Sequence, residues 1–210
     1  MCIRDRHSSV GCVPILRFGT DDQKSRFLPR MASGEWIGGF ALTEPQAGSD
    51  ASNLRTRARR DGDHYVINGA KQFITSGKNG KVVIVFAVTD PDAGKKGISA
   101  FLVPTDTPGY QVVTVEQKLG LHASDTCALA FTDMRVPVEN RLGAEGEGYR
   151  IALANLEGGR IGIAAQSVGM ARGAWQAALA YARDRIAFGR PIAEHLSLIH
   201  ISEPTRQEAI

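Results

Sequence analysis

The spacing of hydrophobic and polar positions changes twice along the chain, and the changes divide it into three regions. In residues 7–30 apolar side chains recur at helical spacing, so this segment is predicted to be helical. Thr20 followed three residues later by Gln23 is a capping-box pattern that predicts the start of a helix, while Pro29 and Gly34 predict its end. The first region is therefore expected to be helix.

The second region begins at Gly39, where short runs of β-branched and aromatic residues predict strands. Clusters of Gly, Pro and Asp separate the runs, and no helical segment lies between them. This order favours antiparallel pairing in a sandwich or barrel and disfavours a parallel Rossmann sheet, for which no G-x-G-x-x-G follows a strand. The predicted strands are residues 64–69, 82–88, 98–104, 110–115 and 127–137.

The third region follows Gly148, where apolar residues return to helical spacing and predict long helices. Glycines inside this region each cost roughly 1 kcal/mol relative to alanine. We expect close packing to offset that cost, because a residue without Cβ lets another backbone or a ligand approach. A membrane G-x-x-x-G segment is excluded, because Arg160, Gln166 and Arg172 interrupt it. The glycines are Gly158, Gly159, Gly162, Gly169 and Gly173.

The two ends of the chain do not continue these patterns. Residues 1–6 (MCIRDR) and 196–210 (LSLIHISEPTRQEAI) resemble translated sequencing-adaptor reads, and neither contributes to the functional argument. We expect both segments to be artefacts and the gene to be cut at both ends.

Composition narrows the class of partner. A formal net charge of +3 suits anionic small molecules but is too weak to indicate nucleic-acid binding. Three cysteines without a C-x-x-C pair favour a reducing compartment. No apolar run reaches the ~18 residues of a membrane span. The five histidines lack metal-ligand spacing, and there is no phosphate-binding G-x-x-x-x-G-K-[ST] or hydrolase G-x-S-x-G.

One bend with candidate chemistry is ALTEPQAGSD (41–50), where helix gives way to strand. Pro45 predicts a turn, Gly48 permits close approach of a backbone, and Ser49 and Asp50 bond neighbouring N–H groups in such turns. These residues alone leave two readings open: a structural link, or a bend that holds a ligand.

Two further segments carry the same ambiguity. KQFITSGKNG (71–80) places Phe73 and Thr75 at a strand end, either facing a ligand or serving as a core phenylalanine and an exposed strand residue. ARDRIAFGRP (182–191) gathers arginines near a helix C-terminus, either as an anion site or as a solvated basic face.

Taken in order, FALTEPQAGSD, INGAKQFITSG, LEGGRIGIAAQSVGMARGAW and ARDRIAFGRPIAEH closely resemble the acyl-CoA dehydrogenase family. The likeness covers residues 7–195, departs at Asn53, and is greatest for short-chain or butyryl-type members. It implies a multi-domain α and β fold, with an antiparallel β-barrel or sandwich flanked by helical segments. The implied domains are the end of an N-terminal helical domain (7–38), a middle β-domain (39–140) and the start of a C-terminal helical domain (141–195).

The resemblance also implies roles for individual residues. Thr43 would bond the pyrimidine side of FAD, Thr75 would lie near flavin N5, and Phe73 would pack on the ring. Ser49 would touch the pyrophosphate and the CoA region, and Glu157–Arg160 would form a substrate-contacting turn. Arg185 and Phe188 would reach the FAD of a neighbouring subunit. The full implied sets are Phe40, Leu42, Thr43, Gly48, Ser49, Phe73, Ile74, Thr75, Arg185 and Phe188 for the cofactor, and Ser49, Glu157, Gly158, Gly159 and Arg160 for the substrate.

The implied reaction is α,β-desaturation of an acyl-CoA thioester, with hydride transfer to FAD and electrons passed to an electron-transferring flavoprotein. The general base is expected beyond the end of this chain, since residue 159, where a minority of the family places it, is glycine. The chain alone is therefore expected to be inactive. The resemblance further implies a tetramer located in a bacterial cytoplasm or, in a eukaryote, the mitochondrial matrix. Alternatives are an acyl-CoA oxidase, a non-catalytic acyl-CoA-binding homologue, or a purely structural β-domain.

Overall fold

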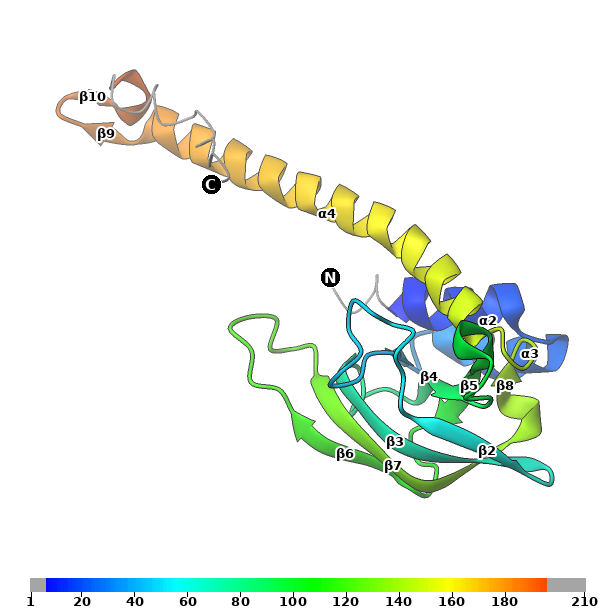
Figure 1. Cartoon of the computed structure of the whole chain (residues 1–210). Helices are drawn as coiled ribbons and strands as arrows, with labels where there is room; N and C mark the ends of the chain where they lie inside the picture. Colours follow the sequence, from blue (N-terminus) through cyan, green and yellow to red (C-terminus); the bar gives the residue numbers. More distant parts are fainter. Residues whose placement is uncertain (1–6, 196–210) are drawn as a thin grey trace. The chain divides into compact units, whose positions relative to one another are not determined.

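A computed structural model describes residues 7–195 of the chain, so the predictions for residues 1–6 and 196–210 fall outside the described residues (Figure 1). The chain divides into two compact units, with the boundary between Arg160 and Ile161. Each unit is described by itself.

The first unit opens with helix, as predicted. A π-helical turn, η1 (His7–Cys12), leads into α2 (Val13–Phe18) and α3 (Asp21–Ala32). The capping box is present, because the N–H of Gln23 bonds the Thr20 hydroxyl at 3.2 Å and the Gln23 side chain accepts from the Thr20 N–H at 3.1 Å. Pro29 does not end α3, which continues to Ala32; Gly34, at φ +82°, follows.

The side chain of Gln23 also attaches α3 to the β-region. Its Nε2 donates to the carbonyl oxygens of Glu139 at 2.7 Å and Arg141 at 2.9 Å. One buried amide therefore closes the first turn of a helix through its oxygen and holds that helix in place through its nitrogen.

The β-region contains eight strands and two short 3₁₀ turns. Each of the five predicted runs falls within a strand, whereas β1, β2 and β8 were not predicted as separate strands. The bounds are β1 (Gly38–Ala41), β2 (Arg57–Asp61), β3 (His64–Thr75), β4 (Val82–Val88), η2 (Gly94–Gly97), β5 (Ile98–Pro104), β6 (Tyr110–Val115), β7 (Thr126–Pro137), η3 (Val138–Asn140) and β8 (Arg141–Leu142).

These strands form one mixed sheet in the order β6-β7-β3-β2-β4-β5-β8, with β1 beside β4 (Figure 1). Most neighbours are antiparallel, as expected, but β1 and β2 both run parallel to β4. The long excursion through β2 and β3 returns β4 alongside β1 in the same direction, and local sequence pattern does not reveal such a pairing. The strand path ends at β6 and β8, so the sheet is not a closed barrel.

Two hydrophobic cores lie on opposite faces of β4, because successive side chains of a strand point to opposite sides. Val82, Ile84 and Phe86 face a core shared with α2, α3 and the start of α4. Val83 and Val85 face a second core shared with β3, β5 and β7. The second core lies between two parts of the same sheet, which makes this region sandwich-like.

The chain continues as a single helix, α4 (Gly148–Asp184), where several helices were expected. It is followed by a small hairpin, β9 (Ile186–Ala187) and β10 (Arg190–Pro191), and by η4 (Ile192–Glu194). The expected close packing of the α4 glycines is not found within the described residues, because a Cβ added at any of the five would meet no atom within 4 Å beyond the neighbouring backbone of its own helix. Among residues 7–195, none of the helices combines the length and the hydrophobicity needed to span a bilayer.

Candidate functional site

The bend that follows β1 is a tight turn. The N–H of Glu44 donates to the carbonyl of Ala47, and the N–H of Ala47 donates back to the carbonyl of Glu44, both at 3.0 Å. Pro45 occupies the second position of this turn, where its fixed φ is favourable. Gly48 and Ser49 follow on the exposed side of the bend.

Ser49 offers an unused polar group on this exposed side. Among residues 7–195, no side chain or backbone group hydrogen-bonds its hydroxyl, and the residue is exposed. The neighbouring carboxylate of Asp50 accepts from the Ser52 hydroxyl at 2.7 Å, whereas the expected bonding of backbone N–H groups by the Ser49 and Asp50 side chains is not found among residues 7–195. The Ser49 hydroxyl is therefore available to a ligand.

The second bend interrupts β3 near its end. Pairing with β7 shifts register between Lys71 and Ile74, and Phe73 within this irregularity has φ +58°. A bulky residue with positive φ is a strained conformation that the surrounding structure must impose. Phe73 is 58% exposed, so its alternative assignment to the core is wrong, while its neighbour Ile74 is buried in the second core.

The fold brings the two bends together. The N–H of Gln72 donates to the carbonyl oxygen of Thr43 at 2.9 Å. On the preceding strand, a Cβ placed on Gly39 would lie 3.1 Å from the carbonyl oxygen of Thr75. The segment containing Thr43 therefore runs beside the segment containing Phe73 and Thr75.

Three of the residues predicted near a cofactor are largely occupied by packing. Leu42 is buried in the first core, and Phe40 is half-buried with its ring centroid 4.7 Å from that of Phe86. Ile74 is buried as well. Leu42 and Ile74 are therefore placed to contact a ligand mainly through their backbones.

A buried ion pair that the sequence reasoning missed lies between the two bends. Lys71 Nζ is 2.8 Å from Glu44 Oε1, and the side chains are 0% and 2% exposed. Burial lowers the pKa of Lys71 to about 8, although the Glu44 carboxylate acts in the opposite direction. Burial acts to raise the pKa of Glu44, but the charge and hydrogen bond of Lys71, together with hydrogen bonds from Arg55 and Thr56, hold the pKa below its usual value. Strand alternation was an available signal, since Tyr65, Ile67 and Lys71 are all inward-facing.

The turn after β3 is held by Asp125. Its carboxylate accepts from the N–H of Lys78 at 2.8 Å, and its carbonyl accepts from the N–H of Ser76 at 3.2 Å. Cys127 is buried nearby, and burial together with the Asp125 carboxylate raises the pKa of its thiol to about 11. The thiol is therefore protonated near neutral pH.

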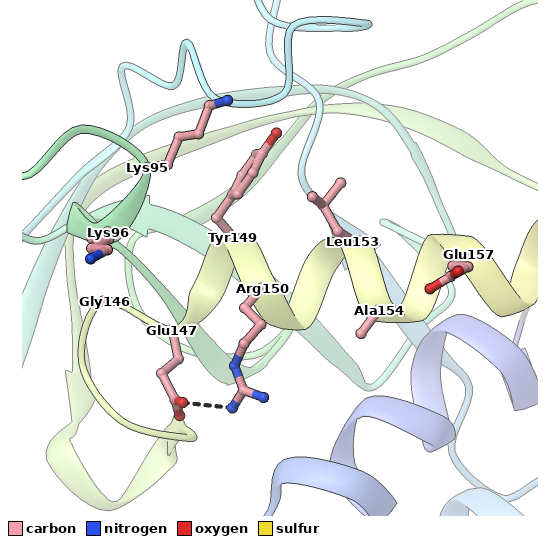
Figure 2. Close-up of a pocket in the computed structure, with 9 residues that line it drawn as sticks. All are labelled: Lys95, Lys96, Gly146, Glu147, Tyr149, Arg150, Leu153, Ala154 and Glu157. Atoms are coloured by element: carbon pink, nitrogen blue, oxygen red, sulfur yellow. Dashed lines mark hydrogen bonds and ion pairs between the residues drawn. The ribbon is translucent and has the colours of Figure 1, made fainter.

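A groove of about 530 Å³ lies between the start of α4 and the turn before β5 (Figure 2). Lys95 reaches over Tyr149, with Nζ 5.5 Å from the ring centroid. Arg150 pairs with Glu147 at 2.6 Å, and the N–H of Ala144 is the main cause that holds the pKa of Glu147 below its usual value. The lining is Lys95, Lys96, Gly146, Glu147, Tyr149, Arg150, Leu153, Ala154 and Glu157.

The predicted substrate turn is helical instead. Glu157, Gly158, Gly159 and Arg160 lie inside α4, where flanking helix-forming residues override the low propensity of two glycines. Of the four, Glu157 alone lines the groove, and Figure 2 shows it on α4 beyond Leu153 and Ala154. Glu157, Gly158 and Arg160 are exposed and Gly159 is partly so.

In the second unit, Arg185 immediately precedes the small hairpin, and Phe188 lies in the turn between its two strands. The N–H of Arg185 donates to the Tyr181 carbonyl at 2.8 Å, immediately after α4 ends. Phe188 and Gly189 have φ +52° and +79°, the signs required at the centre of a type I′ hairpin turn. Phe188 is 97% exposed, and its ring meets the His195 ring edge-on at 5.9 Å. Phe188 and Phe73 thus share positive φ and exposure.

The described residues contain no group of three or more His, Cys, Asp or Glu side chains able to hold a metal ion.

Comparison with known proteins decides the family. Three family models match in succession: the acyl-CoA dehydrogenase N-terminal domain at residues 2–35, the middle domain at 39–134 and the C-terminal domain at 146–200. The chain belongs to the acyl-CoA dehydrogenase family. The resemblance seen in the four sequence segments is therefore confirmed.

Individual family members agree over half their length. An acyl-CoA dehydrogenase from Bacillus subtilis is 50% identical over 97% of this chain and 54% of its own. The structure of butyryl-CoA dehydrogenase from Megasphaera elsdenii matches with a TM-score of 0.90 and 43% identity, over 94% of this chain and 52% of its own. A structure of the electron transferring flavoprotein of Acidaminococcus fermentans contains a chain that matches with a TM-score of 0.91 and 46% identity, over 94% and 52%. The chain thus spans about half the length of these relatives.

Proposed function

We propose that this chain is the FAD-holding part of an acyl-CoA dehydrogenase, and that the whole protein desaturates acyl-CoA thioesters between Cα and Cβ. The observation that supports this most directly is the hydrogen bond from the Gln72 N–H to the Thr43 carbonyl, which joins the two bends. Family membership supports the reaction class, and similarity to a butyryl-CoA dehydrogenase favours short acyl chains.

The residues of the two bends fit an isoalloxazine ring. Phe73 offers an exposed aromatic face held in a strained conformation, as expected of a residue that a ligand covers. Thr43 and Thr75 supply hydroxyls on adjacent segments, and Ser49 supplies a hydroxyl on the exposed bend. Bound FAD would accept a hydride from the substrate. The protein residues would orient the ring and exclude water from one of its faces.

The groove beside α4 is proposed to receive the anionic part of the thioester. The lining has a net charge of +1, because it contains three basic side chains, Lys95, Lys96 and Arg150, and two carboxylates, Glu147 and Glu157. Arg150 is already paired with Glu147. The two lysines of the turn before β5 are therefore the groups best placed for a phosphate. Their replacement by alanine is expected to raise KM for acyl-CoA more than it lowers kcat.

Arg185 and Phe188 are proposed to contact the FAD of a neighbouring subunit. Phe188 is almost fully exposed at a hairpin tip, which supports a role in contacts outside its own chain. This proposal makes cofactor retention depend on assembly, with a homotetramer as the expected form. Removal of the Phe188 ring should then weaken FAD binding in the oligomer without unfolding the subunit.

We propose that the 210-residue chain does not turn over acyl-CoA by itself. Glycine occupies position 159, and Glu157 lies two residues away from that position on the same helix, so neither supplies the base. The whole protein is proposed to pass its electrons to an electron-transferring flavoprotein, which the match to a chain in such a structure supports. The proposed location is a bacterial cytoplasm, or the mitochondrial matrix of a eukaryote.

The test is a titration with FAD, followed by flavin fluorescence. Two purified proteins are compared: the 210-residue chain and the protein expressed from the full-length gene. We expect quenching, a resolved flavin absorption band, and a change in that band when butyryl-CoA is added to the full-length protein. A Leu119→Ala variant, at an exposed loop position, serves as the control. If neither protein quenches FAD fluorescence, the proposed function is wrong. Turnover of acyl-CoA by the 210-residue chain with an artificial electron acceptor would overturn the proposed lack of activity.

A further inference from the structure

The Glu44–Lys71 ion pair is the most completely buried pair of opposite charges among the described residues. Its two members lie on the two bends of the proposed flavin site: Glu44 follows Thr43, and Lys71 precedes Phe73 by two residues. No residue of the pair belongs to the set predicted to touch the cofactor.

The carboxylate of Glu44 is a meeting point for several donors. Besides Lys71, it accepts from the N–H of Arg55 at 2.6 Å, the N–H of Thr56 at 3.1 Å and Nε2 of Gln46 at 2.7 Å. One side chain thereby fixes both ends of the excursion between β1 and β2. A carboxylate satisfied in this way is firmly oriented.

The ammonium of Lys71 extends this network to the other bend. It donates to the carbonyl oxygen of Leu42 at 3.0 Å as well as to Glu44. The next residue of β3, Gln72, bonds the Thr43 carbonyl through its N–H. The backbone on either side of Thr43 is therefore held from β3 by two consecutive residues.

The same network adjoins Phe73 and constrains the backbone before it. Lys71 is anchored before the β3 irregularity, and Ile74 is buried in the core after it. A positive φ at phenylalanine costs on the order of 1–3 kcal/mol and persists only where its surroundings leave no alternative. Two fixed residues three positions apart provide that constraint.

A buried ion pair is by itself weak evidence for a stabilising role. Replacing both members of such a pair by apolar residues of similar size is often neutral or stabilising, whereas removing one member is strongly destabilising. Comparing single with double replacements therefore separates an effect on ligand binding from an effect on folding stability.

From these contacts we propose that Glu44 and Lys71 are positioning residues that hold the Thr43 bend and Phe73 in the relative arrangement required to bind the flavin ring. The proposal rests on the proposed function. Neither residue contacts the ring; each acts through the backbone of its bend.

The test uses the full chain with four variants: Glu44→Gln, Lys71→Met, the double variant Glu44→Met/Lys71→Met, and Arg135→Met. The last removes an exposed ion pair with Asp61 at the same 2.8 Å separation and is the matched control. The dissociation constant for FAD, the visible circular dichroism induced in the bound flavin, and the urea unfolding midpoint are measured for each.

We expect the single variants to unfold at lower urea and the double variant to recover part of that loss, because the N–H groups of Arg55 and Thr56 still lose their acceptor. In the double variant the FAD dissociation constant should nevertheless rise by about tenfold or more, with a weaker induced flavin signal, while Arg135→Met matches the unmodified chain. A double variant with unchanged FAD affinity and an unchanged flavin signal would overturn the positioning role and leave the proposed function standing. Failure of the unmodified chain and of the full-length protein to bind FAD would overturn both.

Discussion

The N–H of Gln72 donates to the carbonyl oxygen of Thr43 at 2.9 Å, so the two proposed flavin-binding bends are joined through their main chains. Side chains at the surface of these bends are consequently free to vary without breaking the link between them. This separation of backbone support from exposed side chains permits tests that affect a ligand and not the fold.

Phe73→Gly is expected to weaken FAD binding without destabilising the protein. Phe73 is exposed and has positive φ, so glycine loses little packing and relieves a strain of roughly 1 kcal/mol. The free energy of unfolding, from urea titration, should stay constant or rise slightly, while the FAD dissociation constant rises. Phe86→Ala is the contrast, because Phe86 is fully buried and its truncation should cost about 3–5 kcal/mol. A stability loss of that size at Phe73 would show that the ring supports the fold.

Gly48→Ala should affect ligand binding and not stability, whereas Gly69→Ala should lower the stability of the fold. A Cβ on Gly48 meets no atom of the described residues within 4 Å, so stability should change by less than about 0.5 kcal/mol, whereas a ligand approaching the bend would meet the added methyl. Gly69 has φ +150°, and its Cβ would lie 2.5 Å from Thr56 Oγ1 and 2.7 Å from Thr56 Cα. Its substitution should destabilise by on the order of 1–3 kcal/mol.

Urea unfolding and FAD titration of both glycine variants provide the check. Unchanged FAD affinity in Gly48→Ala would contradict the close approach of a cofactor to this bend.

Glu44 should make the protein sensitive to acid. Its pKa in the folded state is below the ordinary value of 4.5, so its contribution to stability is present above pH 4.5 and is lost as pH falls through the folded pKa. The double variant Glu44→Met/Lys71→Met should therefore lose less unfolding free energy than the unmodified chain between pH 7 and about pH 3.5. Chemical unfolding at a series of pH values measures the difference. Parallel curves for the two proteins would indicate that Glu44 has a normal pKa in the fold.

Gly169→Ala should stabilise α4 in the isolated chain. No described atom lies within 4 Å of the added Cβ, so the gain is the ordinary helix propensity difference of about 1 kcal/mol. Ala164→Gly, at an exposed position of the same helix, should have the opposite effect. Thermal unfolding followed by far-ultraviolet circular dichroism tests both. In the full-length protein the sign at Gly169 should reverse if another helix packs against it.

Sequence pattern predicted the strands that are runs of apolar, β-branched or aromatic residues, and it missed those that are not. β4 and β5 are apolar runs buried almost throughout, and both were predicted with their observed bounds. β2 has the sequence RARRD, in which Ala58 is the single buried residue, so its pairing with β3 gives no hydrophobic signal. The parallel pairing of β1 with β4 depends on a return of the chain over forty residues, which no local pattern reports.

The sequence predicted the exposed bends of the candidate site. It did not predict the buried ion pair that lies between them. The resemblance to a family pointed to Thr43, Phe73 and Thr75, but gave no reason for the strained conformation of Phe73. Glu44 and Lys71 are charged residues, which are expected at the surface unless paired. Their separation of 27 positions conceals the pairing until the fold is known. Likewise, the resemblance implied a turn at Glu157–Arg160, whereas these residues lie inside α4, as the helical spacing of the region predicted.

The dual use of the Gln23 amide has a consequence for how this region evolves. Asparagine is too short to reach both the Thr20 N–H and the carbonyls of Glu139 and Arg141, and glutamate reaches them without a donor. Position 23 is therefore closed to the two most similar side chains. The start of α3 and its anchorage to the strands must be kept or lost together.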